Sequence, residues 1–259
     1  MRMMKKVLGT VTVLALSVSL LAGCGSTAAS PVSSAASTAA ESTTSSVVSE
    51  TTSAAADENV AAAAQLLNDL TGSYQELWPV ILTDEYQQTW LDDCTALVGE
   101  ENAEAAFEKL SSMVTSDVYG EDAVEAYANG GGAYFCGFTN SLATLTFDGE
   151  TSTISGTDKD GNVLFSHTYH YIGMEPVHGL YEFESDDADS GEFTYFFLAP
   201  DTSAETYHIE FRYGSDAEAL SQYDTGEYAY WLASGISTDC DQTMIDNCIE
   251  LFCTENLAG

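Results

Sequence analysis

Beyond residue 60 the hydrophobic positions first recur every three or four residues, which is the spacing of one face of a helix. This spacing predicts four helices, at residues 61–70, 83–94, 102–114 and 121–128. Thr83 and the two acidic residues after it suit the start of the second helix, because such side chains accept hydrogen bonds from unpaired backbone amides. Three consecutive glycines, residues 130–132, end this helical part.

From residue 133 the pattern changes to short runs of aromatic and β-branched residues that are separated by turn signals such as Asp160-Gly161. These runs predict seven strands, at residues 133–139, 142–147, 151–156, 163–172, 179–185, 192–199 and 206–213. Residues 238–252 return to helical spacing. Seven consecutive strands must hide their edges, which a closed barrel or helices over the rim achieve. We therefore expect an α+β fold in which an antiparallel sheet or barrel is flanked by helices.

The first 24 residues have the layout of an export signal. Three basic residues within the first six positions precede an apolar run at residues 7–21, which is shorter than the roughly 20 residues that a membrane span needs. The run ends in Leu21-Ala22-Gly23-Cys24, which resembles the lipobox of bacterial lipoproteins. That resemblance implies a signal peptide at residues 1–23, lipidation at Cys24 and a place on the extracellular face of the membrane. The alternative is an ordinary signal peptide with an incidental cysteine.

Residues 25–57 form a segment of different composition. Of these 33 residues, 25 are Ser, Thr or Ala, and none is basic. A segment with so little apolar surface does not offset the entropy that a chain loses on folding. We expect a disordered tether after Cys24, able to reach about 100 Å at roughly 3.3 Å per residue, and one folded domain at residues 58–259.

The charge of the chain is strongly one-sided. Beyond the signal only Lys109, Lys159 and Arg212 face 41 carboxylates, a formal charge of 3 − 41 = −38. Nucleic acid is excluded as a partner, because binding to its phosphates needs a basic surface. Such a surface concentrates divalent cations around the protein. The alternative interpretation is that the acidity only keeps an exported protein soluble.

Five cysteines follow Cys24, at positions 94, 136, 240, 248 and 253. Outside the cell they allow two disulfides and leave one thiol over. No C-x-x-C spacing is present, so neither a zinc knuckle nor a thioredoxin-like redox pair is indicated. The alternative role for several of them is that of small apolar core residues.

Histidine is the scarce candidate for chemistry, because no G-x-S-x-G, H-E-x-x-H, phosphate-loop or dinucleotide motif points to an enzyme. In the predicted strand at residues 206–213, His208, Glu210 and Arg212 share one face. An imidazole and a carboxylate two residues apart can bind one zinc ion. The alternative is that His208 is a hydrogen-bonded barrel residue and that Glu210 pairs with Arg212.

The other three histidines lie in or beside the strands. His167 and His170 are three residues apart, so on a regular strand they face opposite ways and only one can share a site with His208. His178 follows Pro176 at a turn. Two oxygen-rich clusters, at residues 158–162 and 184–189, could hold calcium loosely, but solvated hairpin turns explain both.

Five segments stand in a recognisable order: LTGSYQELWP at residues 70–79, YHYIG at 169–173, LYEFE at 180–184, AP at 199–200 and YHIEFRYGSD at 207–216. Together they resemble the ZinT family, zinc- and cadmium-binding proteins also found as the C-terminal domain of some zinc-uptake lipoproteins. The first segment looks like the opening helix of that family. The likeness covers most of residues 60–255 and implies a lipocalin-like (calycin) barrel with flanking helices and a metal near the barrel mouth.

The resemblance also implies a metal site, which this sequence keeps only in part. The family places one histidine shortly before the Ala-Pro pair and two in an H-x-H strand. Here His208 keeps the second H-x-H position, whereas Thr206 and Phe196 replace the other two histidines. The missing ligands must come from elsewhere, and the candidates, in order of preference, are His170, His167, His178 and Glu210.

Two functions follow as hypotheses. The first is a lipid-anchored, non-enzymatic surface protein that captures or buffers Zn²⁺, or alternatively Cd²⁺, for a metal-uptake transporter. The second is a metal-free relative whose barrel binds a small apolar ligand or a surface protein, which the missing histidines and abundant aromatics favour.

Overall fold

The computed structural model describes residues 47–128, 132–199 and 208–258. The chain divides into two units, residues 1–59 and Val60–Gly259. The first unit is described only from Val47, and there it is helical, as the first part of helix α1 (Val47–Asp69). The predicted signal peptide and Cys24 lie outside the described residues. No helix in the described ranges is long and apolar enough to cross a membrane.

Helix α1 corrects the predicted extent of the tether. Residues 47–57, which we expected to be disordered, are helical. The physical reason is the local composition, because three alanines at residues 54–56 are separated by four residues from the alanine run 61–64, and alanine has the highest helix propensity. The remaining predicted tether, residues 25–46, lies outside the described residues.

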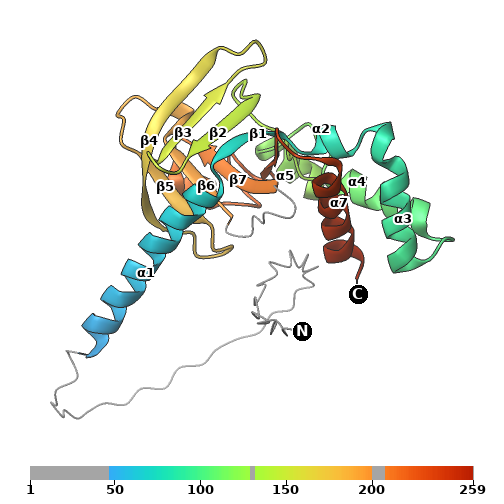
Figure 1. Ribbon diagram of the computed structural model, residues 1–259, viewed down its shortest axis with the longest axis horizontal. Helices are drawn as coiled ribbons and strands as arrows, with labels where there is room; N and C mark the ends of the chain where they lie inside the picture. Colours follow the sequence, from blue (N-terminus) through green and yellow to red (C-terminus); the bar gives the residue numbers. More distant parts are fainter. Residues whose placement is uncertain (1–46, 129–131, 200–207, 259) are drawn as a thin grey trace, which may run out of the picture. The chain divides into compact units, whose positions relative to one another are not determined.

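Eight antiparallel strands form a closed barrel in the order of the sequence (Figure 1). The strands are β1 (Gly72–Glu76), β2 (Thr144–Asp148), β3 (Thr153–Thr157), β4 (Val163–Met174), β5 (Tyr181–Ser185), β6 (Tyr195–Leu198), β7 (His208–Gly214) and β8 (Ala233–Ser237). The barrel closes where β1 pairs with β8, with Tyr74 opposite Ser237 and Glu76 opposite Gly235. Closure leaves no free sheet edge. The predicted lipocalin-like barrel with flanking helices is confirmed.

The predicted strands from residue 142 to residue 213 correspond to β2–β7. The strand predicted at 133–139 is wrong, because in that segment only Phe135 forms isolated bridges, to Thr115 and Trp231. Sequence patterns also missed β1 and β8. Residues 70–79, which resemble an opening helix, instead form β1 and the start of the short helix α2 (Trp78–Ile81).

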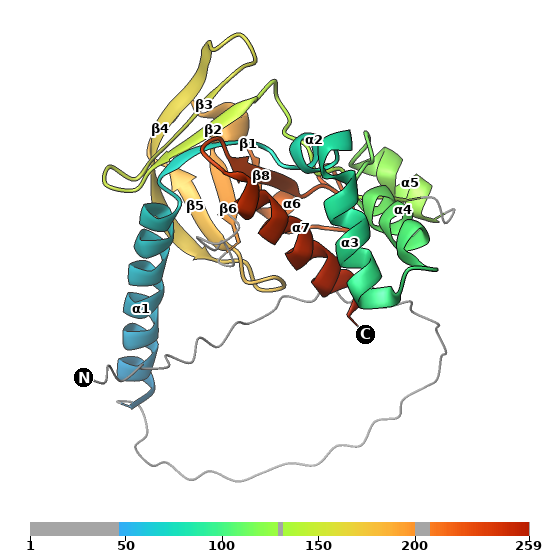
Figure 2. The same cartoon turned by 45° about the vertical axis from the view of Figure 1, so that its right-hand side comes forward.

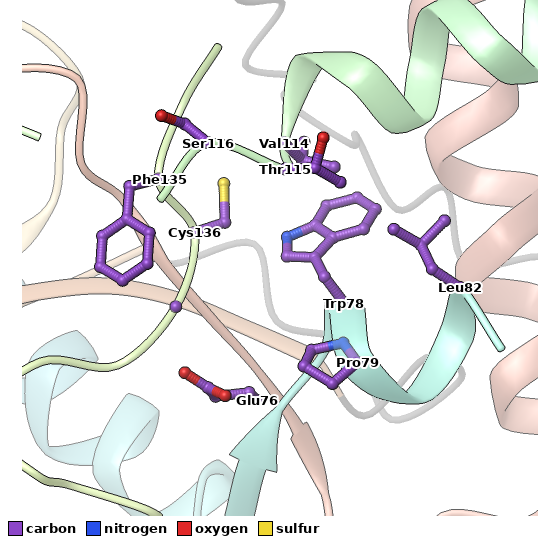
Figure 3. Close-up of a pocket in the computed structure, with 10 residues that line it drawn as sticks. Glu76, Trp78, Pro79, Leu82, Val114, Thr115, Ser116, Phe135 and Cys136 are labelled. Carbon is purple, nitrogen blue, oxygen red and sulfur yellow. The ribbon is translucent and has the colours of Figure 1, made fainter. Parts of the chain in front are cut away.

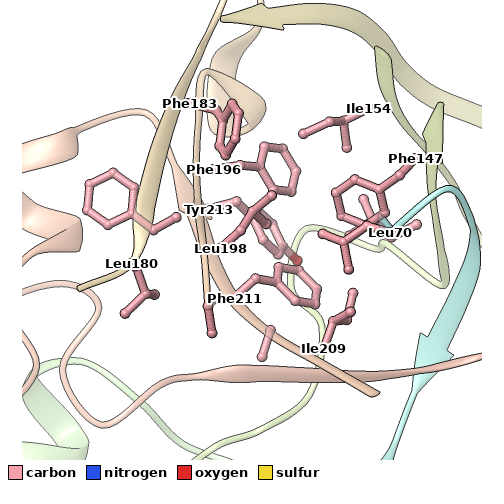
Figure 4. Close-up of a cluster of buried hydrophobic side chains, with 14 of the residues drawn as sticks. Leu70, Phe147, Ile154, Leu180, Phe183, Phe196, Leu198, Ile209, Phe211 and Tyr213 are labelled. Atoms are coloured by element: carbon pink, nitrogen blue, oxygen red, sulfur yellow. The ribbon is translucent and has the colours of Figure 1, made fainter. Parts of the chain in front are cut away.

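The interior of the barrel is filled by large apolar side chains (Figure 4). Phe147, Phe183, Phe196, Phe211 and Tyr213 are all at most 1% exposed. Several rings lie edge to face or stacked, which adds to the stabilisation from burial alone. The last turns of α1 contribute Leu66 and Leu67 to the same cluster, and Leu70 joins it just after the helix ends.

A second hydrophobic cluster lies between the outer wall of the barrel and a layer of helices. The remaining helical segments are η1 (Asp84–Tyr86), α3 (Gln87–Val98), α4 (Ala103–Met113), α5 (Glu121–Ala128), η2 (Gly191–Phe193), α6 (Ala217–Leu220) and α7 (Gln242–Leu257). Ile236 of β8 packs in this cluster with Trp90 of α3, Leu110 of α4 and Ile249 of α7. Figure 2 shows α7 between β8 and α3. The side chain of Asp241 begins α7 by accepting a hydrogen bond from the amide of Met244 at 3.0 Å.

One strand position requires glycine. A Cβ atom added at Gly156 of β3 would lie 2.4 Å from both Leu142 and the ring of Phe165. Both neighbours belong to the barrel core, where a small-to-large change forces the packing apart.

We therefore expect Gly156→Ala to lower the free energy of unfolding by about 1–3 kcal/mol, measured by urea denaturation. Gly173→Ala in β4 is the matched control, because a Cβ there meets only Glu182 Oε2 at 3.4 Å. Its effect should stay within about 0.5 kcal/mol. Equal losses from the two substitutions would contradict the packing described for β3.

Candidate metal site

His208 and Glu210 lie on the same face of β7, as the alternation of the strand predicts. Ile209 and Phe211, which alternate with these two residues along the strand, belong to the barrel core. In the register with β8, His208 stands opposite Ile236, which packs in the helical layer. The two predicted ligands therefore face the outer wall of the barrel, under the helices. Thr206, which stands at the first H-x-H position, lies outside the described residues.

The outer wall near Glu210 also carries two buried cysteines. Burial, and then the negative charge of Glu210, raises the pKa of Cys136 and of Cys248 to about 12. A thiol binds metal as the thiolate. At neutral pH, in the absence of a metal ion, both sulfurs are therefore protonated. Phe196, at the family's remaining histidine position, is fully buried in the barrel core.

His170 lies on the outer, exposed face of β4 and is surrounded by carboxylates. Its Nδ1 is 2.7 Å from Asp186 Oδ1, just beyond the end of β5. Its Nε2 is 4.0 Å from Oε2 of Glu184, the residue directly opposite it on β5. The hydroxyl of Tyr195 on β6 donates to the other oxygen of Glu184 at 3.2 Å. Three neighbouring strands thus hold one histidine and two carboxylates together.

His167 lies on the opposite face of β4, with Phe165 and Tyr169, as its spacing from His170 predicts. Its Nδ1 is 2.7 Å from Asp187 Oδ2. The side chain is 18% exposed, while that of Asp187 is 59% exposed, so this pair stands where the barrel interior meets solvent. His167 and His170 therefore belong to two separate histidine–carboxylate pairs.

His178 is placed by a buried carboxylate that sequence analysis did not single out. Glu175 is fully buried and accepts hydrogen bonds from the amides of Val177 at 3.0 Å and His178 at 2.5 Å. The His178 ring lies 3.8 Å from the ring of Tyr223, centroid to centroid. In this turn the buried carboxylate of Glu175 holds the backbone.

Arg212, the third residue on the His208 face of β7, has a structural role. Its guanidinium is fully buried, donates to the carbonyls of Leu220, Gln222 and Tyr228, and lies 4.2 Å from the centre of the Tyr223 ring. It fixes the loop between α6 and β8 against the barrel wall.

The two oxygen-rich clusters, at residues 158–162 and 184–189, have different roles in the structure. Asp158 accepts hydrogen bonds from the amides of Asp160 and Asn162, each at 2.9 Å, as in a hairpin turn. The hydrogen bond from the Asn162 side chain, together with those from the amides, holds the pKa of Asp158 below its usual value. The cluster at residues 184–189 instead supplies the carboxylates that pair with His167 and His170. Proximity in space, which spacing along the chain does not reveal, distinguishes the two.

Within the described residues, no three His, Cys, Asp or Glu side chains already surround a position that could hold a metal ion. The structure brings together His170 with Glu184 and Asp186, and His167 with Asp187. It does not bring His167, His170 and His178 into a single group.

The described residues also form a cleft of about 320 Å³ outside the barrel interior (Figure 3). Trp78, Leu82, Val114 and Phe135 give it an apolar lining, and the carboxylate of Glu76 stands at its edge. The Glu76 carboxylate accepts a hydrogen bond from the amide of Phe138 at 2.6 Å.

No family model matches this chain, and no curated protein sequence matches it. Among solved structures the chain is similar to the Zn(II)-bound ZinT-like domain of AdcA from Streptococcus pneumoniae, with a TM-score of 0.44 and 15% identity over 70% of this chain and 87% of that chain. It is also similar to Zn(II)-bound AdcA of the same organism, with a TM-score of 0.41 and 13% identity. That match covers 71% of this chain and 34% of AdcA. The barrel assignment rests on the strand pairing and not on these likenesses.

The two histidine–carboxylate pairs predict one tautomer. A neutral imidazole that faces a carboxylate with Nδ1 must carry its proton there, which leaves the Nε2 lone pair available. At pH 8 we therefore expect long-range ¹H–¹⁵N NMR spectra to show the Nδ1–H form for His167 and His170. Asp186→Asn should change the pattern of His170 and leave that of His167 unchanged. An Nε2–H form for both rings in the wild type would contradict the pairing.

Proposed function

We propose that this protein is a lipid-anchored surface protein that binds Zn²⁺, or alternatively Cd²⁺, for metal acquisition or buffering. The observation that carries the proposal is the arrangement around His170. Its Nδ1 is held 2.7 Å from Asp186, and its Nε2 faces Glu184 across 4.0 Å. Histidines that bind metals typically present one ring nitrogen to the ion and donate the other N–H to a carboxylate.

The distance between His170 Nε2 and Glu184 Oε2 suits a shared ion. Zinc binds nitrogen and carboxylate oxygen at about 2.0–2.2 Å, so two ligands at a tetrahedral angle are about 3.4 Å apart. Both side chains are partly exposed, at 53% and 38%, and a small rotation closes the gap. Asp186 then has the orienting role, and water completes the coordination.

An open site of this kind fits capture and release better than a structural role. Structural zinc sites are closed by four protein ligands, whereas His170 and Glu184 supply two. The net charge of −38 beyond the signal raises the local concentration of divalent cations, which favours occupancy of a weak site. We propose that a metal-uptake transporter receives the ion. The pair of His167 and Asp187 is a second, weaker candidate on the same strand.

Zinc titration of the full chain by calorimetry at pH 7.5 tests this site. We expect binding that weakens at least tenfold in His170→Ala and in Glu184→Gln, and about 10- to 100-fold in Asp186→Asn because the orienting bond is lost. Thr168→Ala, an exposed position on the same face of β4, is the matched control and should bind as the wild type does.

Two outcomes would contradict the proposed site. If the wild-type protein binds no zinc, the proposed zinc-binding function is wrong. If zinc binding persists in His170→Ala but is lost in His208→Ala, the binding site is at His208 on the outer wall of β7 and not at His170. A parallel titration with Cd²⁺ separates the two metals.

The anchor predicts a second measurable outcome. If Cys24 is acylated, the chain expressed in a bacterium that processes lipoproteins should incorporate labelled palmitate and sediment with membranes. Cys24→Ser should abolish the label and release the protein into the soluble fraction, because two or more acyl chains supply the stable attachment. Membrane association that persists in Cys24→Ser would contradict lipid anchoring.

Binding of a small apolar molecule is a second candidate function. The cleft beside Trp78 is a better place for such a molecule than the barrel interior. Its volume of about 320 Å³ lies at the lower end of the range for ligand sites, while the interior is filled by side chains. Fluorescence titration with an apolar dye tests this function, and Leu82→Glu in the cleft wall should weaken the binding.

A further inference from the structure

Two cysteines on neighbouring helices have their sulfur atoms in contact. Cys94 of α3 and Cys253 of α7 are both fully buried, and their Sγ atoms are 4.0 Å apart. Among the cysteines in the described ranges, this is the pair of thiols that touch each other. The two residues are separated by 159 positions in the sequence. Packing of the C-terminal helix against α3 therefore brings together two thiols that spacing along the chain does not connect.

We propose that Cys94 and Cys253 form a disulfide that links α7 to α3 in the exported protein. A disulfide has an S–S distance of about 2.05 Å, so the sulfurs must approach by about 2 Å. Both side chains lie in the cluster that holds the helical layer together, where Trp90 and Ile249 are their neighbours. The inference is independent of zinc, because neither sulfur belongs to the group around His170.

The reaction is a thiol–disulfide exchange with a small-molecule disulfide, such as oxidised glutathione. The thiolate of one cysteine attacks the oxidant, a mixed disulfide forms, and one small thiol leaves. The second cysteine, as its thiolate, then attacks the protein sulfur of the mixed disulfide and releases the other small thiol. Two protein thiols are oxidised and one oxidant molecule is reduced to two thiols, so atoms and electrons balance.

Burial determines when this step can occur. Burial is the main cause that raises the pKa of both thiols, and exchange requires a thiolate that an oxidant can reach. The bond therefore forms while α7 is undocked, during folding or local opening, and is protected once the helix has packed. Cross-links that close long loops restrict the unfolded chain most. The consequence is a C-terminal helix that resists opening and proteolysis outside the cell.

The sparse basic residues make the test direct. Beyond residue 6 trypsin has three cleavage sites, after Lys109, Lys159 and Arg212. Cys94 lies in the fragment that ends at Lys109, and Cys253 lies in the fragment 213–259. The full chain is refolded with reduced and oxidised glutathione, blocked with N-ethylmaleimide, denatured and digested. Mass spectrometry should find these two fragments joined, and dithiothreitol should separate them.

Variants distinguish this pairing from others, because fragment 213–259 also holds Cys240 and Cys248. Cys253→Ala and Cys94→Ala should each leave the fragments separate, whereas Cys248→Ala, a buried cysteine of the same helix, should leave them joined. Dithiothreitol should lower the Tm of the wild type by at least about 5 °C and leave that of Cys253→Ala unchanged. Separate fragments in the unreduced wild type, or joined fragments in Cys253→Ala, would overturn the proposal.

Discussion

The pairing of β1 with β8 is the constraint on which the rest of the structure depends. It joins residues 72–76 to residues 233–237 and converts a meander with two open edges into a barrel. The same contact sets the position of the helices, because α2 follows β1 and α7 follows β8. Closure thus places both helices on one side of the barrel, where Ile236 joins Trp78 and Ile249 in the second cluster. The interior cluster and the helical layer therefore depend on one seam.

That seam is also what sequence patterns could not predict. Strands β2–β7 are rich in aromatic and β-branched residues in alternation, so local preference and final structure agree. In contrast, β8 reads Ala-Ser-Gly-Ile-Ser and has little strand preference of its own. At Gly235 an added Cβ would lie 3.0 Å from the side chain of Ile209, so β8 and β7 pack closely there. Pairing with β1 and β7 therefore determines that these residues form a strand. The reverse holds for residues 133–139, which are aromatic but receive only bridges at Phe135.

The candidate site shows the same division between local and distant information. Alternation along β4 correctly predicts that His167 and His170 face opposite ways. Their partners Asp187 and Asp186 lie 16 or more residues away, and they become neighbours only because β5 returns beside β4. From the sequence alone these carboxylates were indistinguishable from those of the turn at Asp158. Charge and spacing identify candidate ligands, but the register between strands decides which of them meet.

The distribution of positive charge links the barrel to its proposed ligand. Arg212, the only arginine beyond the signal, is fully buried and holds backbone carbonyls, so it neutralises no surface carboxylate. His167 and His170 are the groups that lie close to exposed carboxylates. Protonation would turn each contact into an ion pair, whereas a divalent ion needs the imidazole neutral with its Nε2 lone pair free. In the proposed site a proton and a metal ion would therefore compete for the same nitrogen of His170. With the predicted Nδ1–H tautomer, the 2.7 Å contact with Asp186 would orient the ring of the proposed site before an ion arrives.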